Sequence, residues 1–150
     1  ELFEMQFQLA LSNKKSLILH NREAVDDILT LVQKNWDKQL EYGTVFHCCE
    51  PNKKILEFAK DHKIFLGVDG DITYTPEKQE FVKQIPLDML VVETDSPFLL
   101  PEPMRSRKEF PNEPKNIPFI ISFIANVLGK SEEELQKITT ENAKRLFTVE

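Results

Sequence analysis

The sequence predicts an α/β protein built on a parallel sheet, and three observations lead to this prediction. Four short apolar runs, typical of buried strands, alternate with segments of helical periodicity along the chain. Successive strands are separated by about 20 to 30 residues, which suits β-α-β crossovers. The run Met89–Val92 is apolar throughout, as strands covered on both faces of a parallel sheet are. We therefore expect an all-parallel sheet with right-handed connections.

The predicted elements follow one another in a regular order within a single domain of 150 residues. The chain begins with a helix over residues 2–11. The predicted strands are 16–20, 44–47, 63–68 and 89–92, and the helices between them are 22–40, 51–62 and 76–84. The closing helices are 117–128, 131–137 and 139–147, with Ser131 and Thr139 as N-caps and Gly129 as a stop signal.

The composition excludes several classes of protein. Apolar residues make up 41% of the chain, enough for one core, but no apolar segment approaches the roughly 20 residues of a membrane-spanning helix. No secretion signal is visible, and the only cysteines, Cys48 and Cys49, are adjacent, so we expect a cytoplasmic protein without disulfides. The net charge of −6 argues against a broad basic surface that holds nucleic acid by counterion release.

Side chains that bind metal ions well close three of the four predicted strands. His20 and His47 end the first two strands, and Asp95 follows the fourth. Because the carboxyl ends of parallel strands lie on one face, we expect these three side chains to converge. Two imidazoles and a carboxylate suit zinc, and also manganese, iron or magnesium if water completes the shell. Such an ion would lower the pKa of bound water and polarise a phosphoryl oxygen.

Other polar residues near these strand ends have supporting roles in this prediction. Glu93 lies one pleat deeper than Asp95 and is expected to orient a metal ligand from behind. Arg22 follows His20 by two residues, so it should lie near the same face. A basic cluster in the long loop could neutralise phosphate at the mouth of the site or simply be solvated; it comprises Arg105, Arg107 and Lys108.

Each of these residues also has a plainer interpretation. A lone histidine at a strand end is more often a hydrogen-bonded structural residue, and only the matching positions favour a metal site. Asp69 and Asp71 are typical of a turn, although either could contact a metal or substrate. Cys49 shares a strand face with His47 and could ligate, but a small buried side chain is the simpler expectation. Cys48 should pack toward the helices.

A set of motifs spread over the whole chain points to one family. The motifs are Leu17-Ile-Leu-His-Asn-Arg22, Val45-Phe-His-Cys48, Gly67-Val-Asp-Gly70, Ile85-Pro-Leu-Asp88, Val92-Glu-Thr-Asp-Ser-Pro97, Asn112-Glu-Pro114 and Thr139-Thr-Glu-Asn-Ala-Lys-Arg-Leu-Phe147. Together they resemble the TatD-type metal-dependent hydrolases, or TatD-related deoxyribonucleases. The resemblance implies a TIM barrel with one or two divalent ions, such as zinc, magnesium or manganese, that cleaves phosphodiester bonds of DNA.

The resemblance also implies roles for individual residues. His20 and His47 match two histidine ligands of the family, and Asp95 matches an aspartate that binds metal and handles the proton of the attacking water. Arg22 and the pair Asn112 and Glu113 match positions near the substrate. Amidohydrolase-type cleavage of another bond, such as an amide or ester, is an alternative, because the barrel supports many chemistries.

This sequence departs from the family in one important way. A His-x-His pair and a bridging glutamate, which the family carries early in the barrel, are absent from it. Residues 1–150 therefore resemble the C-terminal half of the barrel, with its last four strands and their helices. A half-barrel has open edges, so we expect a fragment, a partner half or self-association, and weak or no activity from the chain alone. A non-catalytic half-barrel that serves binding or assembly is the alternative.

Overall fold

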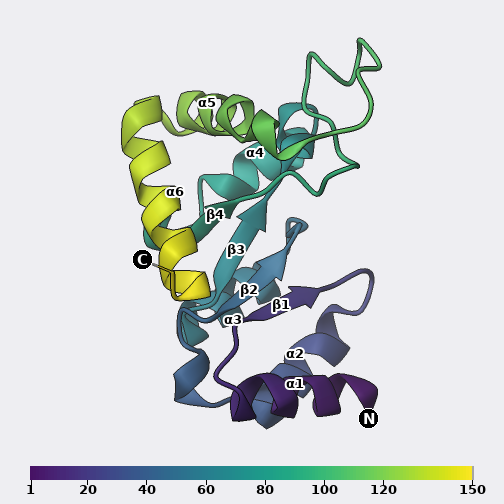
Figure 1. Cartoon of the computed structure of the whole chain (residues 1–150), viewed down its shortest axis with the longest axis vertical. Coiled ribbons are helices and arrows are strands. Elements are labelled where there is room, and N and C mark those ends of the chain that lie inside the picture. The colour runs from purple at the N-terminus through teal and green to yellow at the C-terminus, as the bar shows by residue number, and fades with distance from the viewer. Residues whose placement is uncertain (150) are drawn as a thin grey trace.

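The computed structural model describes residues 1–149 and contains a parallel sheet in the order β1-β2-β3-β4. The strands are β1 Leu17–His20, β2 Thr44–His47, β3 Phe65–Val68 and β4 Leu90–Val92. The α-helices are α1 Leu2–Ser12, α2 Val25–Asn35, α3 Lys53–His62, α4 Pro76–Val82, α5 Ile117–Leu128 and α6 Glu132–Phe147. Strands that are consecutive in sequence are neighbours in the sheet (Figure 1), which confirms the predicted α/β architecture. Within residues 1–149, no helix has the length and apolarity that a membrane crossing requires.

The sheet has two different apolar faces, because side chains alternate along each strand. One face packs against the helices and contributes Leu19, Phe46 and Leu66 to the main core. The other face carries a smaller cluster of Val45, Phe65 and Val91, which Leu146 of α6 covers. On the same face of β1, Ile18 is 60% exposed. This second face corresponds to the lining of a barrel, and here it is covered only in part.

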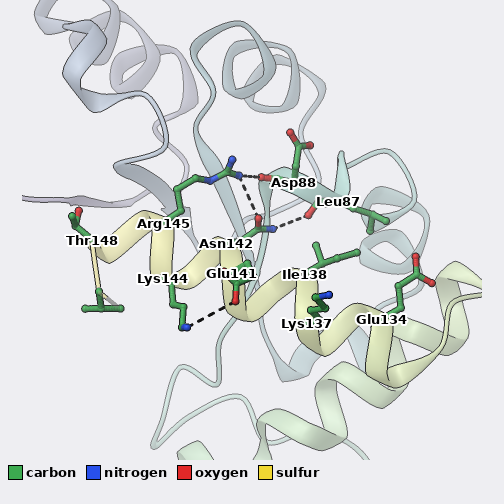
Figure 2. A pocket seen from close by; sticks show the side chains of 11 residues that line it. Leu87, Asp88, Glu134, Lys137, Ile138, Glu141, Asn142, Lys144, Arg145 and Thr148 are labelled. Atoms are coloured by element: carbon green, nitrogen blue, oxygen red, sulfur yellow. Dashed lines mark hydrogen bonds and ion pairs between the residues drawn. The ribbon is translucent and has the colours of Figure 1, made fainter.

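Helix α6 lies at the end of the sheet where the strands begin. Asn142 of α6 donates hydrogen bonds from Nδ2 to the carbonyls of Leu87, at 2.7 Å, and Leu90, at 2.8 Å. Arg145 places its guanidinium 3.9 Å from the ring centre of Tyr42. Figure 2 shows these α6 side chains beside an open hollow of about 1110 Å³. In Figure 1 the strand arrowheads point away from α6, so this hollow lies away from the strand ends that carry the histidines.

Replacing Asn142 by alanine is expected to lower the free energy of unfolding by roughly 2 to 4 kcal/mol, because two carbonyls lose their donor. The matched control is Asn126→Ala, an exposed position on α5 that should change stability by less than about 0.5 kcal/mol. Urea denaturation followed by circular dichroism measures both. Equal effects of the two substitutions would contradict the anchoring role of Asn142.

The closing helices differ from the prediction. Residues 132–147 form one continuous helix, whereas we predicted a break with Thr139 as an N-cap. The Thr139 hydroxyl instead donates to the carbonyl of Leu135, four residues earlier and at 3.0 Å. A threonine that satisfies its hydroxyl within the helix does not need to end it. The other predicted cap is confirmed, since the hydroxyl of Ser131 accepts from the backbone N–H of Glu134 at 3.1 Å.

Several elements are shorter than the apolar pattern predicted, and α2 and β3 show the reason. Helix α2 ends at Asn35, because Trp36 takes an extended backbone with ψ of 134°, and only a short 3-10 turn covers Lys38–Leu40. Strand β3 starts at Phe65, because Lys63 ends α3 in the left-handed conformation with φ of 52°. In both places an apolar residue beyond the element packs without extending the helix or strand.

Candidate active site

His47 lies at the C-terminal end of β2 between two carboxylates. Its Nδ1 is 2.6 Å from Oε2 of Glu93, and its Nε2 is 3.3 Å from Oδ1 of Asp95. A neutral imidazole carries one N–H, so it can donate to only one of these two carboxylates. With the proton on Nδ1, the Nε2 lone pair and the Asp95 carboxylate lie close together, an arrangement that a cation between the two atoms would stabilise.

The spacing of Nε2 and Oδ1 suits a divalent ion. Two donors that are each about 2.1 Å from a tetrahedral zinc ion lie about 3.4 Å apart. His20 pairs with His47 in the sheet, and the two ring centres are 5.7 Å apart. Among residues 1–149, however, no three His, Cys, Asp or Glu side chains are grouped closely enough to hold a metal. His47 and Asp95 thus fit as two donors, and His20 lies beside them without completing the predicted trio.

The position of Glu93 is set by the backbone around it. Its Oε1 accepts a hydrogen bond from the backbone N–H of Cys48 at 2.5 Å, while its Oε2 faces His47. The carboxylate occupies the space above Gly67, where a Cβ atom would come within 2.4 Å of Oε1. This arrangement suits the orienting role predicted for Glu93, and it depends on a glycine at position 67.

Asp95 is held in an uncommon conformation by a buried asparagine. Its backbone is left-handed, with φ of 52°, which is unusual for a residue other than glycine. Asn112 is 2% exposed, and its Nδ2 donates to the carbonyls of Thr94, at 2.8 Å, and Phe98, at 2.6 Å. Asn112 Oδ1 accepts from the amide of Asn116 at 2.8 Å. Asn112 thus supports the turn that carries Asp95 from the interior of the chain.

The remaining predicted substrate residues have different surroundings. Arg22 is exposed and lines a pocket of about 390 Å³ together with His20, as its position after β1 predicted. Arg105 lies 3.3 Å from Glu102, and its guanidinium is 4.2 Å from the ring centre of Tyr74. Glu113 forms an ion pair with Lys115 at the surface. Arg22 thus shares this pocket with His20, a predicted metal ligand.

Cys49 is a small buried side chain, as predicted, whereas Cys48 lies beside Asp69 and is not among the buried residues of the main core. Cys48 has a left-handed backbone with φ of 46°, which turns the chain directly after β2. Cys49 is therefore buried in the core between sheet and helices, where its pKa is raised by burial to about 12. Burial raises the pKa of the Cys48 thiol, and the neighbouring Asp69 carboxylate raises it further. Strand alternation fails here because the strand has already ended at His47.

A buried charged cluster lies next to Cys48, and the sequence predicted only part of it. Lys78 of α4 is 3% exposed, and its Nζ lies 2.6 Å from Oδ2 of Asp71 and 3.6 Å from Oδ2 of Asp69. Burial first, and then the adjacent Asp69, raise the pKa of Asp71 to about 7. The two aspartates were predicted as turn residues, but Lys78 was missed. Lys78 precedes the apolar residues Phe81 and Val82 by three and four positions, so all three lie on the buried face of α4. This spacing could have indicated from the sequence that Lys78 is buried.

Comparison with known proteins identifies relatives along the whole chain. The family model for TatD related DNase matches residues 1–148. The uncharacterized metal-dependent hydrolase YabD of Bacillus subtilis is 34% identical over 99% of this chain and 57% of its own length. The 3'-5' ssDNA/RNA exonuclease TatD of Erwinia tasmaniensis is 35% identical over 99% of this chain and 59% of its own length.

A solved structure supports the same fold. YjjV, a TatD homologue from Escherichia coli, superposes with a TM-score of 0.84 and 22% identity, over 97% of this chain and 54% of that one. The chain spans about half the length of the curated relatives it matches. The parallel sheet and its helices therefore correspond to part of a TatD-type TIM barrel, as predicted.

Proposed function

The chain belongs to the family of TatD-related DNases, and on this basis we propose that it contributes to a metal-dependent hydrolase that cleaves phosphodiester bonds of nucleic acid. The observation that carries the proposal is the approach of His47 Nε2 to Asp95 Oδ1 at 3.3 Å, at the end of β2. Support comes from relatives whose names describe metal-dependent hydrolases and 3'-5' ssDNA/RNA exonucleases.

Each residue near His47 has a defined role in this proposal. His47 and Asp95 would hold a divalent ion such as zinc, magnesium or manganese, with His20 beside them, and one or two ions would serve the complete site. The ion would supply a Lewis acid and lower the pKa of bound water. Glu93 accepts from Nδ1 of His47, which leaves the lone pair of Nε2 free for the ion. Asp95 accepts the proton of the attacking water.

The substrate side of the proposal rests mainly on Arg22. Its guanidinium makes no ion pair within residues 1–149, and it lines the pocket of about 390 Å³ beside His20. A pocket of that volume is within the usual range for small ligands, and Arg22 would neutralise a phosphate in it. We also propose Arg105 and Glu113 as substrate contacts, which would first have to leave their present partners, Glu102 and Lys115.

A non-catalytic role is the second candidate function. It is favoured by one observation, namely that residues 1–149 contain no group of three side chains able to hold a metal. Within residues 1–149, the outer edges of β1 and β4 have no strand partner, and Ile18 is exposed, so we also propose pairing with a complementary half-barrel or a second copy. Light scattering would exclude self-pairing if the chain is monomeric at all concentrations.

The unlinked cysteines support a cytoplasmic location.

The Asp95→Asn substitution tests the proposed chemistry. We expect the chain to release nucleotides from labelled single-stranded DNA slowly, only with zinc, magnesium or manganese, and we expect Asp95→Asn to lower the rate at least about 100-fold. The matched control is Asp61→Asn, an exposed position on α3 that should leave the rate unchanged. Hydrolysis of small esters without cleavage of DNA would favour a different bond. No cleavage and no divalent binding by titration calorimetry would favour the non-catalytic role.

A further inference from the structure

The buried lysine Lys78 joins three segments of the chain. Its Nζ lies 2.6 Å from Asp71 and 3.6 Å from Asp69, both in the turn after β3, and 3.4 Å from Oε1 of Glu50 in the loop after β2. Asp69 is fully buried, and its Oδ1 accepts from the backbone N–H of Asp71 at 2.8 Å. One ammonium from α4 therefore serves carboxylates of two loops that rise from the C-terminal edge of the sheet.

Such a cluster is not an efficient way to stabilise a fold. Removing charges from water costs several kcal/mol per ion, and apolar residues of similar volume often replace a buried ion pair without loss of stability. Within residues 1–149, Asp69 Oδ2 and Asp71 Oδ1 also have no hydrogen-bond donor. The cluster thus has a cost that packing alone does not explain, which points to a role in holding a particular geometry.

Cys48 connects this cluster to His47. Cys48 lies two residues before Glu50 and beside Asp69, and its left-handed backbone makes the turn that follows β2. The backbone N–H of Cys48 donates to Oε1 of Glu93, whose other oxygen faces Nδ1 of His47. A shift of the turn at Cys48 would move the donor that fixes Glu93 and, with Glu93, the orientation of the imidazole.

We propose that Lys78, Asp69 and Asp71 are positioning residues that hold the turn at Cys48, so that Glu93 fixes His47 with Nε2 toward Asp95. The three residues act through Cys48 and Glu93, and they do not contact the reacting atoms. This role adds detail to the proposed function. It rests on that function in one respect, namely that His47 binds the metal.

The experiment uses two variants and a control of the same chain. The single variant, Lys78→Met, removes the ammonium and keeps the length of the side chain. The double variant combines Lys78→Met with Asp71→Asn, so it also removes one of the carboxylates that the loss of the ammonium leaves unpaired. Lys83→Met is the control, because Lys83 follows α4 at the surface, is 46% exposed and forms an ion pair with the exposed Glu80. Long-range proton–nitrogen spectra at about pH 8, above the ordinary histidine pKa of about 6.5, report which ring nitrogen of His47 carries the proton. Zinc affinity is measured by competition with a chromogenic chelator.

In the unmodified chain and in Lys83→Met, His47 is expected to carry its proton on Nδ1. Both Lys78 variants should show a mixture of tautomers and about ten-fold weaker zinc binding, even though the double variant regains most of the stability lost in Lys78→Met. A double variant with recovered stability and an unchanged His47 spectrum would overturn the proposal. If Lys78→Met does not fold, the double variant decides. The tautomer needs neither metal nor cleavage, so this test is independent of the proposed function.

Discussion

The Gly67→Ala variant is expected to fold and yet to bind zinc about 10- to 100-fold more weakly than the unmodified chain. A Cβ atom at position 67 would lie 2.4 Å from Oε1 and 3.0 Å from Cδ of Glu93, so the carboxylate must move. Once displaced, Glu93 loses the hydrogen bond from the Cys48 backbone and its contact with Nδ1 of His47. The stability loss should stay below about 1.5 kcal/mol, because the shortest contacts are with a flexible side-chain end, and the backbone carbonyl oxygen of Phe46, at 3.3 Å, needs to shift only slightly.

Two comparisons make the Gly67→Ala result specific. Gly43→Ala is the matched control, since the nearest atom to its added Cβ is the Leu40 carbonyl oxygen at an ordinary 3.6 Å. Adding Glu93→Ala to Gly67→Ala should weaken zinc binding no further, because both changes remove the same contact. Additive losses, or a Gly67→Ala chain that binds zinc normally in the chelator competition, would show that Glu93 does not orient His47.

Raising the pH from about 5 to about 8 is expected to lower the free energy of unfolding through Asp71. Burial first, and then Asp69, raise the pKa of Asp71 to about 7 in the folded chain, above its ordinary value near 3.8, while Lys78 opposes the shift. The folded state then binds more protons than the unfolded state between these values. Stability is therefore fully present below about pH 4 and is lost as the pH rises through about 7, by at most about 1.4 kcal/mol per pH unit.

The Asp71→Asn variant isolates this contribution. Its stability should change less steeply between about pH 5 and about pH 8 than that of the unmodified chain, as urea denaturation at a series of pH values would show. Burial is the largest single influence on the pKa of Asp69 and raises it, but Lys78 and several hydrogen bonds together outweigh burial and lower that pKa, so Asp69 does not contribute in this window. Parallel pH profiles for the two chains would contradict the assignment to Asp71, since the other titrating groups are common to both.

The strands and the residues at their ends were predictable because both depend on local patterns. Short apolar runs such as Thr44–His47 identify strands regardless of their neighbours, and parallel strands bring their carboxyl ends to one edge. The side-by-side arrangement of His20 and His47 and the contacts of His47 with Glu93 and Asp95 follow from that edge. The motifs of the family are also local stretches of sequence, so they were recognisable in a chain that spans about half the length of its relatives.

Features that depend on contacts between distant residues were not predictable in this way. Thr139 was expected to begin a helix, but a hydroxyl that bonds Leu135 lets α6 continue, and Asn142 anchors that helix to β4. The sequence did not indicate that the side-chain amide of Asn112 is buried and donates to the carbonyls of Thr94 and Phe98 on either side of Asp95.

Local periodicity thus accounts for the parallel sheet and for the gathering of two histidines and two acids at its edge. Only the packed chain decides that Lys78 meets Asp71 and that Cys48 turns its backbone toward Glu93. The reason is physical, because the partner of a buried charge or of a backbone N–H is whichever group the fold brings within about 3 Å, and spacing along the chain does not encode it.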